Sequence, residues 1–270
     1  MALPKAGFGE ISPLQLMRLI GLPDAPLILD TCLPEDVALD PVRIPTAVPV
    51  AHTDLDDVVA AAAGRRCVVV CQKGKKLSHG VAAHLRANGI AAEVLCGGMV
   101  AWRAADLPAI PLDRLPKGSR WVTRHRPKID RLACPWLIRR FIDPAADILY
   151  VPPSEVSAVA QKFEAIAFDT PEADFTHQGT RCTFDALLDH FDLRTSALDR
   201  VSDVVRAADT GTPDMVPEAA GLLAISVGLS RQFKDDQSQL AAALPLYDAL
   251  YRWSRDGHTE SHDWTEESQP

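Results

Sequence analysis

The 270-residue sequence predicts an α/β protein in which a parallel sheet flanked by helices is followed by a helix-rich α+β domain. Three observations lead to this prediction. In the first third of the chain, short apolar runs alternate with helical patterns, which is typical of a parallel sheet. Three prolines and a glycine then interrupt residues 107–119, as is common between domains. Amphipathic helical patterns dominate the second half.

The elements expected in the first domain follow one another at short intervals. The predicted strands are residues 26–30, 65–71 and 90–95, and the predicted helices are residues 54–64, 77–89 and 99–105. The run "RRCVVVC" at 65–71 is rich in β-branched residues, like strands that a parallel sheet buries on both faces. Asn88 and Gly89 are an end signal for the helix that precedes the last strand.

The second domain is expected to combine short strands with longer helices. Strands are predicted at residues 119–124, 146–153 and 166–170, and helices at 156–163, 184–191, 196–209 and 245–256. The resulting division is a first domain at 1–110, a linker at 111–118, a second domain at 119–256 and a polar, flexible tail at 257–270.

Composition excludes several classes of protein. The chain has no run of 18 apolar residues and no signal-peptide pattern, so we expect a cytoplasmic protein without a membrane partner. Its six cysteines contain no C-x-x-C pair, which favours free thiols over disulfides or a zinc ribbon. We expect no cofactor.

Charge is distributed unevenly along the chain. The net charge is −8, yet residues 117–140 carry eight basic groups and one acid, and the chain from residue 141 onward carries nine basic groups against 23 acids. Such a basic segment within an acidic domain attracts anions locally, or is simply a solvated charged face.

Cys71 is the candidate catalytic residue. It follows a buried strand, and the carboxyl ends of parallel strands are where such sheets place functional groups. Gly74 permits a backbone turn that points N–H groups inward, and the next helix adds its positive dipole end. Three nearby lysines also favour a thiolate, which is the nucleophilic form. The expected substrate-binding loop is Gln72, Lys73, Gly74, Lys75, Lys76 and Leu77.

The first domain resembles rhodanese-like sulfurtransferases over about residues 10–110. The resemblance rests on "LILD", on "VVVCQKG", and on "LRANGIAAEVLCGGMVAW", which is the most specific stretch. It implies that Cys71 takes sulfur from thiosulfate or another anionic sulfane donor, holds it as a persulfide and passes it to cyanide or a thiol.

Two positions distinguish this loop from its relatives. Phosphatase and arsenate-reductase loops need an arginine six residues after the cysteine to grip an oxyanion, and here that residue is Leu77. The rhodanese-like family often has an arginine where this chain has Cys32. Cys32 is either a packed small residue or a thiol that resolves the persulfide into a disulfide. His79 and His84 could tune the thiolate or be bystanders.

A basic segment opens the second domain. Arg124, Arg126 and Lys128 alternate at strand spacing, which predicts one shared face, and Arg131 follows in a helical stretch. Arginine forks suit tetrahedral oxyanions such as chromate, so these four residues are the candidate oxyanion-binding set. The same groups could contact DNA phosphates, but no basic recognition helix accompanies them.

This domain is similar to the C-terminal domain of the ChrB chromate-resistance family. The matching stretches are "WVTRHRPKIDRLACPWLIRRFID", "ILYVPPSE", "AIAFDTPEADFTHQGTRCTFDALL" and "PLYDALYRWSR". The resemblance implies a role in chromate resistance, either as a chromate-responsive regulator or as an accessory detoxification protein.

The same domain contains residues that can bind metals. They are Asp169, Asp174, His177 and Cys182, together with His125 and Asp130. Their spacing fits no standard site, and the favoured interpretation is that they are polar turn residues that cap a helix beginning near Thr183. No metal site is therefore predicted.

Three functions follow from these observations. The first is a sulfurtransferase associated with chromate resistance. The second is a chromate-responsive regulator or oxyanion-binding protein with a non-catalytic first domain, for which DNA would be a partner. The third is a redox sensor that pairs Cys71 with Cys32.

Overall fold

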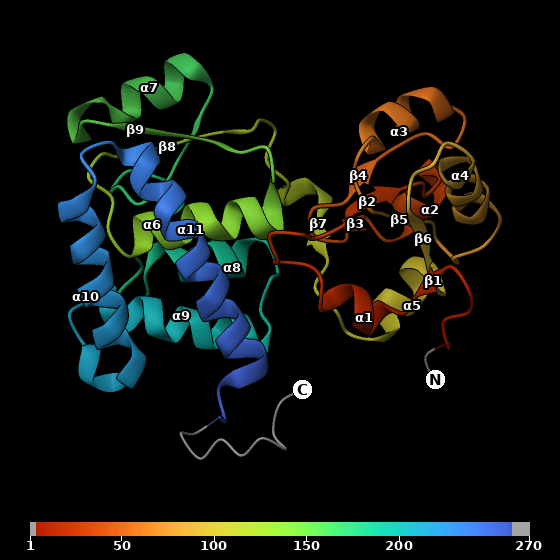
Figure 1. Ribbon diagram of the computed structural model, residues 1–270. Helices are drawn as coiled ribbons and strands as arrows, with labels where there is room; N and C mark the ends of the chain where they lie inside the picture. The colour runs from red at the N-terminus through yellow and green to blue at the C-terminus, as the bar shows by residue number, and fades with distance from the viewer. Residues whose placement is uncertain (1–3, 261–270) are drawn as a thin grey trace.

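The computed structural model describes residues 4–260 (Figure 1). The strands and helices up to residue 111 form an N-terminal half, and those from residue 120 onward form a C-terminal half beside it. Residues 261–270, which make up most of the predicted tail, lie outside the described residues. The domain boundaries at 110, 118 and 256 stay predictions.

The N-terminal half contains a five-stranded parallel sheet in the order β1-β6-β5-β2-β4. Its strands are β1 (Glu10–Ile11), β2 (Leu27–Asp30), β4 (Val48–Pro49), β5 (Cys67–Val70) and β6 (Ala92–Leu95). A separate antiparallel pair joins β3 (Val42–Arg43) to β7 (Ile110–Pro111). The central strands β2 and β5 are buried along their whole length, as the apolar runs predicted.

Helices cover both faces of this sheet. They are α1 (Pro13–Met17), α2 (Pro34–Leu39), α3 (Leu55–Ala62), α4 (Lys76–Ala87) and α5 (Gly98–Ala104). Apolar residues of α3 and α4 pack with Leu29 and Val69 on one face. Residues of α1 and α5 share the other apolar cluster with Ile28 and Val68. The α/β class and the flanked parallel sheet are therefore as predicted.

The C-terminal half combines three parallel strands with a helical assembly. The strand order is β10-β8-β9, with β8 (Arg120–Arg124), β9 (Asp147–Val151) and β10 (Ile166–Ala167). The α-helices are α6 (Asp130–Leu137), α7 (Val156–Phe163), α8 (Thr183–His190), α9 (Ser196–Asp209), α10 (Pro217–Gln232) and α11 (Asp236–Arg252). Short 3₁₀ segments occur at Leu112–Arg114, Pro153–Glu155 and Pro213–Met215, and π-helical turns at Ile138–Ile142 and Trp253–Gly257.

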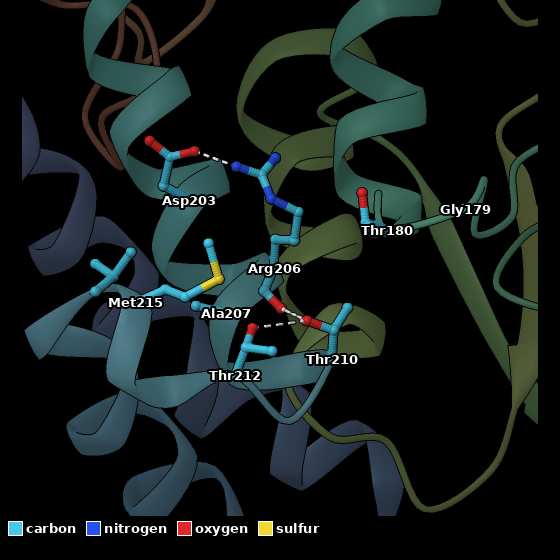
Figure 2. A pocket seen from close by; sticks show the side chains of 9 residues that line it. Gly179, Thr180, Asp203, Arg206, Ala207, Thr210, Thr212 and Met215 are labelled. Atoms are coloured by element: carbon cyan, nitrogen blue, oxygen red, sulfur yellow. Dashed lines mark hydrogen bonds and ion pairs between the residues drawn. The ribbon is translucent and has the colours of Figure 1, made fainter.

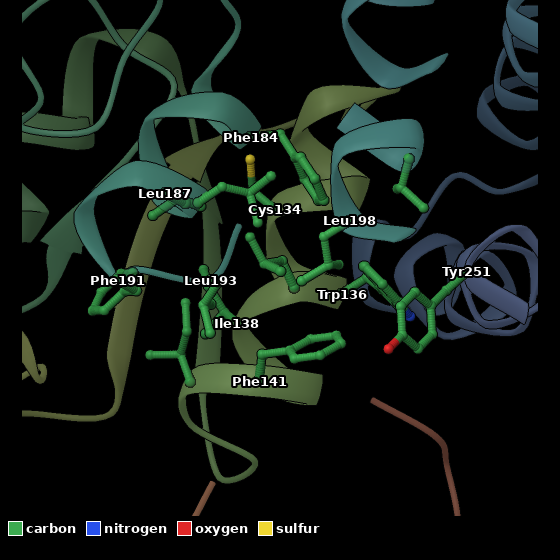
Figure 3. Close-up of a cluster of buried hydrophobic side chains, with 14 of the residues drawn as sticks. Cys134, Trp136, Ile138, Phe141, Phe184, Leu187, Phe191, Leu193, Leu198 and Tyr251 are labelled. Carbon is green, nitrogen blue, oxygen red and sulfur yellow. The ribbon is translucent and has the colours of Figure 1, made fainter. Parts of the chain in front are cut away.

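An aromatic cluster forms the core of the C-terminal half (Figure 3). The ring of Trp136 stacks on Phe184 at a centroid distance of 6.4 Å and meets Phe141 edge-on at 5.7 Å. Its indole N–H donates to the Asp248 carboxylate at 2.8 Å, so the one polar atom of the buried ring has a partner.

The same apolar cluster continues into the N-terminal half, across the boundary between the two predicted domains. Gly21 marks the contact. A Cβ atom there would lie 2.3 Å from the Phe141 ring and 2.9 Å from the Tyr251 ring, and φ is +84°. Only glycine fits both the left-handed backbone and the close approach. The two halves are therefore packed against each other rather than merely linked.

Within residues 4–260, none of the helices combines the length and the apolar character needed to cross a bilayer.

Candidate functional site

Cys71 follows the last residue of the central strand β5, and the loop after it turns back toward α5. Gly74 lies at the centre of this turn with φ +60°, and a Cβ atom there would lie 2.5 Å from the Leu95 carbonyl oxygen. The backbone N–H groups of Met99 and Val100 donate to the carbonyls of Cys71 and Gln72 at 3.2 and 3.1 Å. The loop is thus held by backbone contacts, and glycine is required at its tightest point.

The Cys71 Sγ atom lies among hydrogen-bonding groups. The Lys75 N–H donates to it at 3.3 Å, and the Ser78 hydroxyl lies 3.1 Å away. Although burial opposes ionisation, the contact with Ser78 and the N–H groups of Lys75, Ser78 and Lys73 lower the pKa of the Cys71 thiol below its ordinary value. The loop therefore favours a thiolate.

The cationic side chains of the loop face solvent. Lys73, Lys75 and Lys76 are exposed, and none of them forms an ion pair within residues 4–260. Gln72 and Leu77 are half-buried. These lysines can attract an anion to the loop but, as ammonium groups, cannot form the bidentate grip of an arginine.

Cys32 lies near the same loop, but its surroundings disfavour a thiolate. Burial raises its pKa, and the Asp30 carboxylate and the charge of Cys71 raise it further. Asp30 itself accepts the Cys32 N–H at 3.0 Å and lies 3.7 Å from Arg43. Cys32 is therefore a neutral thiol in this state, which favours the packed-residue interpretation over a resolving thiolate.

The two helix histidines make other contacts. His79 lies 3.4 Å from the Glu10 carboxylate, and His84 contacts the Asn88 side chain at 3.4 Å.

The predicted shared face of Arg124, Arg126 and Lys128 is wrong. Strand β8 ends at Arg124, and Arg126 has φ +56°, so the chain leaves the sheet before it can alternate further. Pro127 follows, and its ring restricts the backbone of the preceding residue. The guanidinium of Arg126 donates to the Ser230 carbonyl at 3.0 Å, and Lys128 is exposed. These side chains do not form one anion-binding row.

The side chains of Arg124 and Arg131 contact the same carboxylate. They lie 3.0 and 3.1 Å from the same oxygen of Asp169, which is 5% exposed. Burial, together with the charge of Asp130, raises the pKa of Asp169, and the two arginines oppose that rise. Both arginines therefore form ion pairs with a buried aspartate. This partly neutralises the positive charge that the sequence suggested was available to bind an oxyanion.

A histidine and three aspartates meet beside these arginines. The His177 Nε2 atom lies 3.4 Å from Asp130, 3.4 Å from Asp169 and 3.3 Å from Asp209. Contact with the Asp130 carboxylate, opposed by burial, raises the pKa of His177 to about 8. Burial, with the charge of Asp130, raises the pKa of Asp209 to about 6. Asp130, His177 and Asp209 offer ligand atoms within 4.8 Å of one another, so they could hold a metal ion.

Within residues 4–260, the group of ligand atoms that could share a metal ion does not include Asp174, His125 or Cys182. Asp174 and His125 are exposed. Cys182 is buried at the start of α8, where burial and the charge of Asp130 raise its pKa. Helix α8 does begin at Thr183, as predicted. Sequence reasoning missed Asp209, because an acid on an amphipathic helix looks like any solvated residue.

The strand order and the cysteine loop characterise the N-terminal half. Parallel strands in the order β1-β6-β5-β2-β4, with a cysteine loop after the central strand, give the N-terminal half the rhodanese-like fold expected from the sequence. Residues 121–254 match the family model described as ChrB, C-terminal domain. The chain therefore combines an N-terminal half of rhodanese-like fold with a C-terminal half that matches the ChrB C-terminal domain model.

Individual proteins are similar to parts of the chain. Protein ChrB of Cupriavidus metallidurans is 37% identical over 137 residues, which is 50% of this chain and 40% of that protein. The chain thus spans less than half the length of this curated relative. Thiosulfate sulfurtransferase of Pseudomonas aeruginosa is 28% identical over 40% of this chain and 20% of its own, with a TM-score of 0.34. A rhodanese-like domain protein of Staphylococcus aureus is 29% identical over 35% of this chain and 91% of its own, with a TM-score of 0.31.

Proposed function

We propose that the chain is a sulfurtransferase that carries sulfane sulfur as a persulfide on Cys71 and that acts in chromate resistance. In the first step the Cys71 thiolate attacks the outer sulfur of thiosulfate. A sulfur–sulfur bond forms at Cys71 while the bond to the sulfonate sulfur breaks, and sulfite leaves with that electron pair. In the second step cyanide or a thiolate attacks the outer persulfide sulfur, and Cys71 departs as a thiolate. No external oxidant or reductant is needed.

The observation that carries this proposal is the environment of the Cys71 sulfur. It accepts the Lys75 N–H, contacts the Ser78 hydroxyl, and has a lowered pKa although the residue is 5% exposed. The same donors suit a persulfide, which also carries a negative charge at neutral pH. The exposed lysines of the loop would draw in a dianionic donor, because a cluster of one sign of charge concentrates opposite ions.

The test is thiocyanate formation from thiosulfate and cyanide by the full chain. We expect turnover in the unmodified protein and in Cys67→Ala, which changes a buried cysteine at the other end of β5. We expect none above background in Cys71→Ser with an unchanged circular-dichroism spectrum. Activity that survives in Cys71→Ser, or no turnover and no sulfur loading in the unmodified protein, would overturn the proposal.

A second candidate is a chromate-responsive regulator with a non-catalytic rhodanese-like domain. It is favoured by one observation: the ChrB family match covers residues 121–254 and excludes Cys71. On this alternative chromate or DNA binds and the binding survives Cys71→Ser, whereas thiosulfate loads no sulfur onto Cys71. Chromate and DNA titrations of the unmodified protein and of Cys71→Ser, beside the sulfur-loading measurement, therefore separate the candidates.

A further inference from the structure

Three carboxylates from separate parts of the chain converge on one ring nitrogen. Asp130 opens α6, Asp169 follows β10 and Asp209 ends α9, while His177 lies in the loop before α8. The distances from Nε2 to the three carboxylates are 3.3–3.4 Å. These exceed the usual 2.7–3.2 Å of an N–H···O hydrogen bond, and one ring nitrogen has at most one proton to donate. A direct hydrogen bond therefore accounts for at most one of the three contacts.

The distances from His177 Nε2 to Asp130 and Asp209 instead match those between neighbouring ligand atoms around a metal ion. Atoms about 2.1 Å from a metal are about 3.0 Å apart in an octahedral shell and about 3.4 Å apart in a tetrahedral one. We propose that Asp130, His177 and Asp209 form a binding site for a divalent transition-metal ion. The proposal does not depend on sulfur transfer by Cys71.

The surrounding contacts hold the ligands in place. The Asp130 carboxylate accepts the N–H groups of Thr183 and Phe184 at 2.7 and 3.0 Å, so it also caps α8. Asp169 accepts the Thr183 hydroxyl at 3.2 Å and bonds to Arg124, which suits a supporting rather than a ligating role. Such outer partners orient metal ligands and are a regular part of metal sites.

The location favours a ligand as well. Arg124 and Asp169 lie at the carboxyl ends of parallel strands, where open α/β sheets bind their ligands. A pocket of about 660 Å³ lies between Gly179–Thr180 and the last turns of α9 (Figure 2). His177 precedes Gly179 by two residues and Asp209 follows Ala207 by two, although neither of them lines the pocket. The pocket volume is within the range of small-molecule sites.

The donor set indicates the kind of metal. One imidazole with two carboxylates suits Mn²⁺ or Fe²⁺ better than Ca²⁺ or Mg²⁺, which prefer oxygen alone. Thiolates, by contrast, select softer ions. MnCl₂ is therefore a probe that discriminates this site from the cysteines.

The experiment titrates the chelator-treated full chain with MnCl₂ and follows free Mn²⁺ by electron paramagnetic resonance. We expect one Mn²⁺ per chain, and an affinity at least about tenfold weaker in His177→Ala and in Asp209→Asn. His125→Ala and Asp174→Asn, which change exposed residues outside the cluster, should bind as the unmodified protein does. Asp130 is not used, because its loss would also remove the cap of α8.

A second measurement guards against variants that misfold. Electron spin echo spectra of the unmodified protein with Mn²⁺ should contain the coupling of a directly bound imidazole nitrogen. Absence of this coupling, absence of saturable binding, or equal affinity in the cluster and control variants would overturn the proposal, and His177 would then be only the cation of an ion-pair cluster.

Discussion

Ser78 offers a direct test of how the loop ionises Cys71. Its hydroxyl lies 3.1 Å from the Cys71 sulfur and 3.1 Å from the Lys75 carbonyl, so it can donate to a thiolate or accept from a thiol. A hydrogen bond to a charged group contributes about 1.5–3 kcal/mol. At about 1.4 kcal/mol for each pKa unit, Ser78→Ala should raise the pKa of Cys71 by about one to two units.

The assay is the rate of iodoacetamide alkylation at Cys71 as a function of pH. Only the thiolate reacts, so the rate rises through the pKa and then levels off. In Ser78→Ala the midpoint should move to higher pH, and below the unmodified midpoint the rate should fall by about ten- to a hundredfold. Ser157→Ala, at an exposed serine of α7, should leave the profile unchanged. An unmoved midpoint in Ser78→Ala would refute the idea that hydrogen bonds offset burial at this thiol.

Three further predictions concern the fold around the sites. Gly74→Ala should lower the free energy of unfolding by about 2–5 kcal/mol, because alanine is strained in the left-handed region and its Cβ would clash with backbone atoms. Gly80→Ala, in the middle of α4 where a Cβ atom meets nothing, should be neutral or stabilising by up to about 1 kcal/mol. Urea unfolding measures both changes. In the same assay, Arg124→Ala should lower the free energy of unfolding by about 1–2 kcal/mol, because it removes one of the cations that contact the buried Asp169. Lys128→Ala, at an exposed position, should have no measurable effect. Phe141→Ala should lower the free energy of unfolding by about 3–5 kcal/mol, because the ring packs between the two halves. In calorimetry the variant should show a single cooperative transition at lower temperature. Two separate transitions in the unmodified protein would contradict the shared core.

The N-terminal half could be predicted well because its signals are local. The valine run, Gly74 and the Asn88-Gly89 stop each act over a few residues. Strands β2, β5 and β6 and helices α3, α4 and α5 lie where they were expected, whereas the short helices α1 and α2 were not predicted. The edge strands β1 and β4 have two residues each and carry no periodic pattern. They form only because the neighbouring strand offers unpaired backbone groups.

The C-terminal half was harder because its important contacts are long-range. The spacing of Arg124 and Arg126 suggested a common face, but the turn before Pro127 ends the strand. No local sequence pattern around Asp209 indicates that α9 places it beside His177, which lies 32 positions earlier in the chain. Likewise, the contact of Gly21 with Phe141 depends on how two sets of helices pack, which no local pattern encodes.

Sulfur carried by Cys71 would change the mass of the protein. The full chain is treated with thiosulfate, freed of excess reagent and measured by intact-mass and peptide mass spectrometry without reductant. We expect the mass of the protein to increase by one sulfur atom. The added sulfur should lie on the peptide that contains Cys71 and should be absent from Cys71→Ser. An unchanged mass, or sulfur on another cysteine that persists in Cys71→Ser, would contradict it.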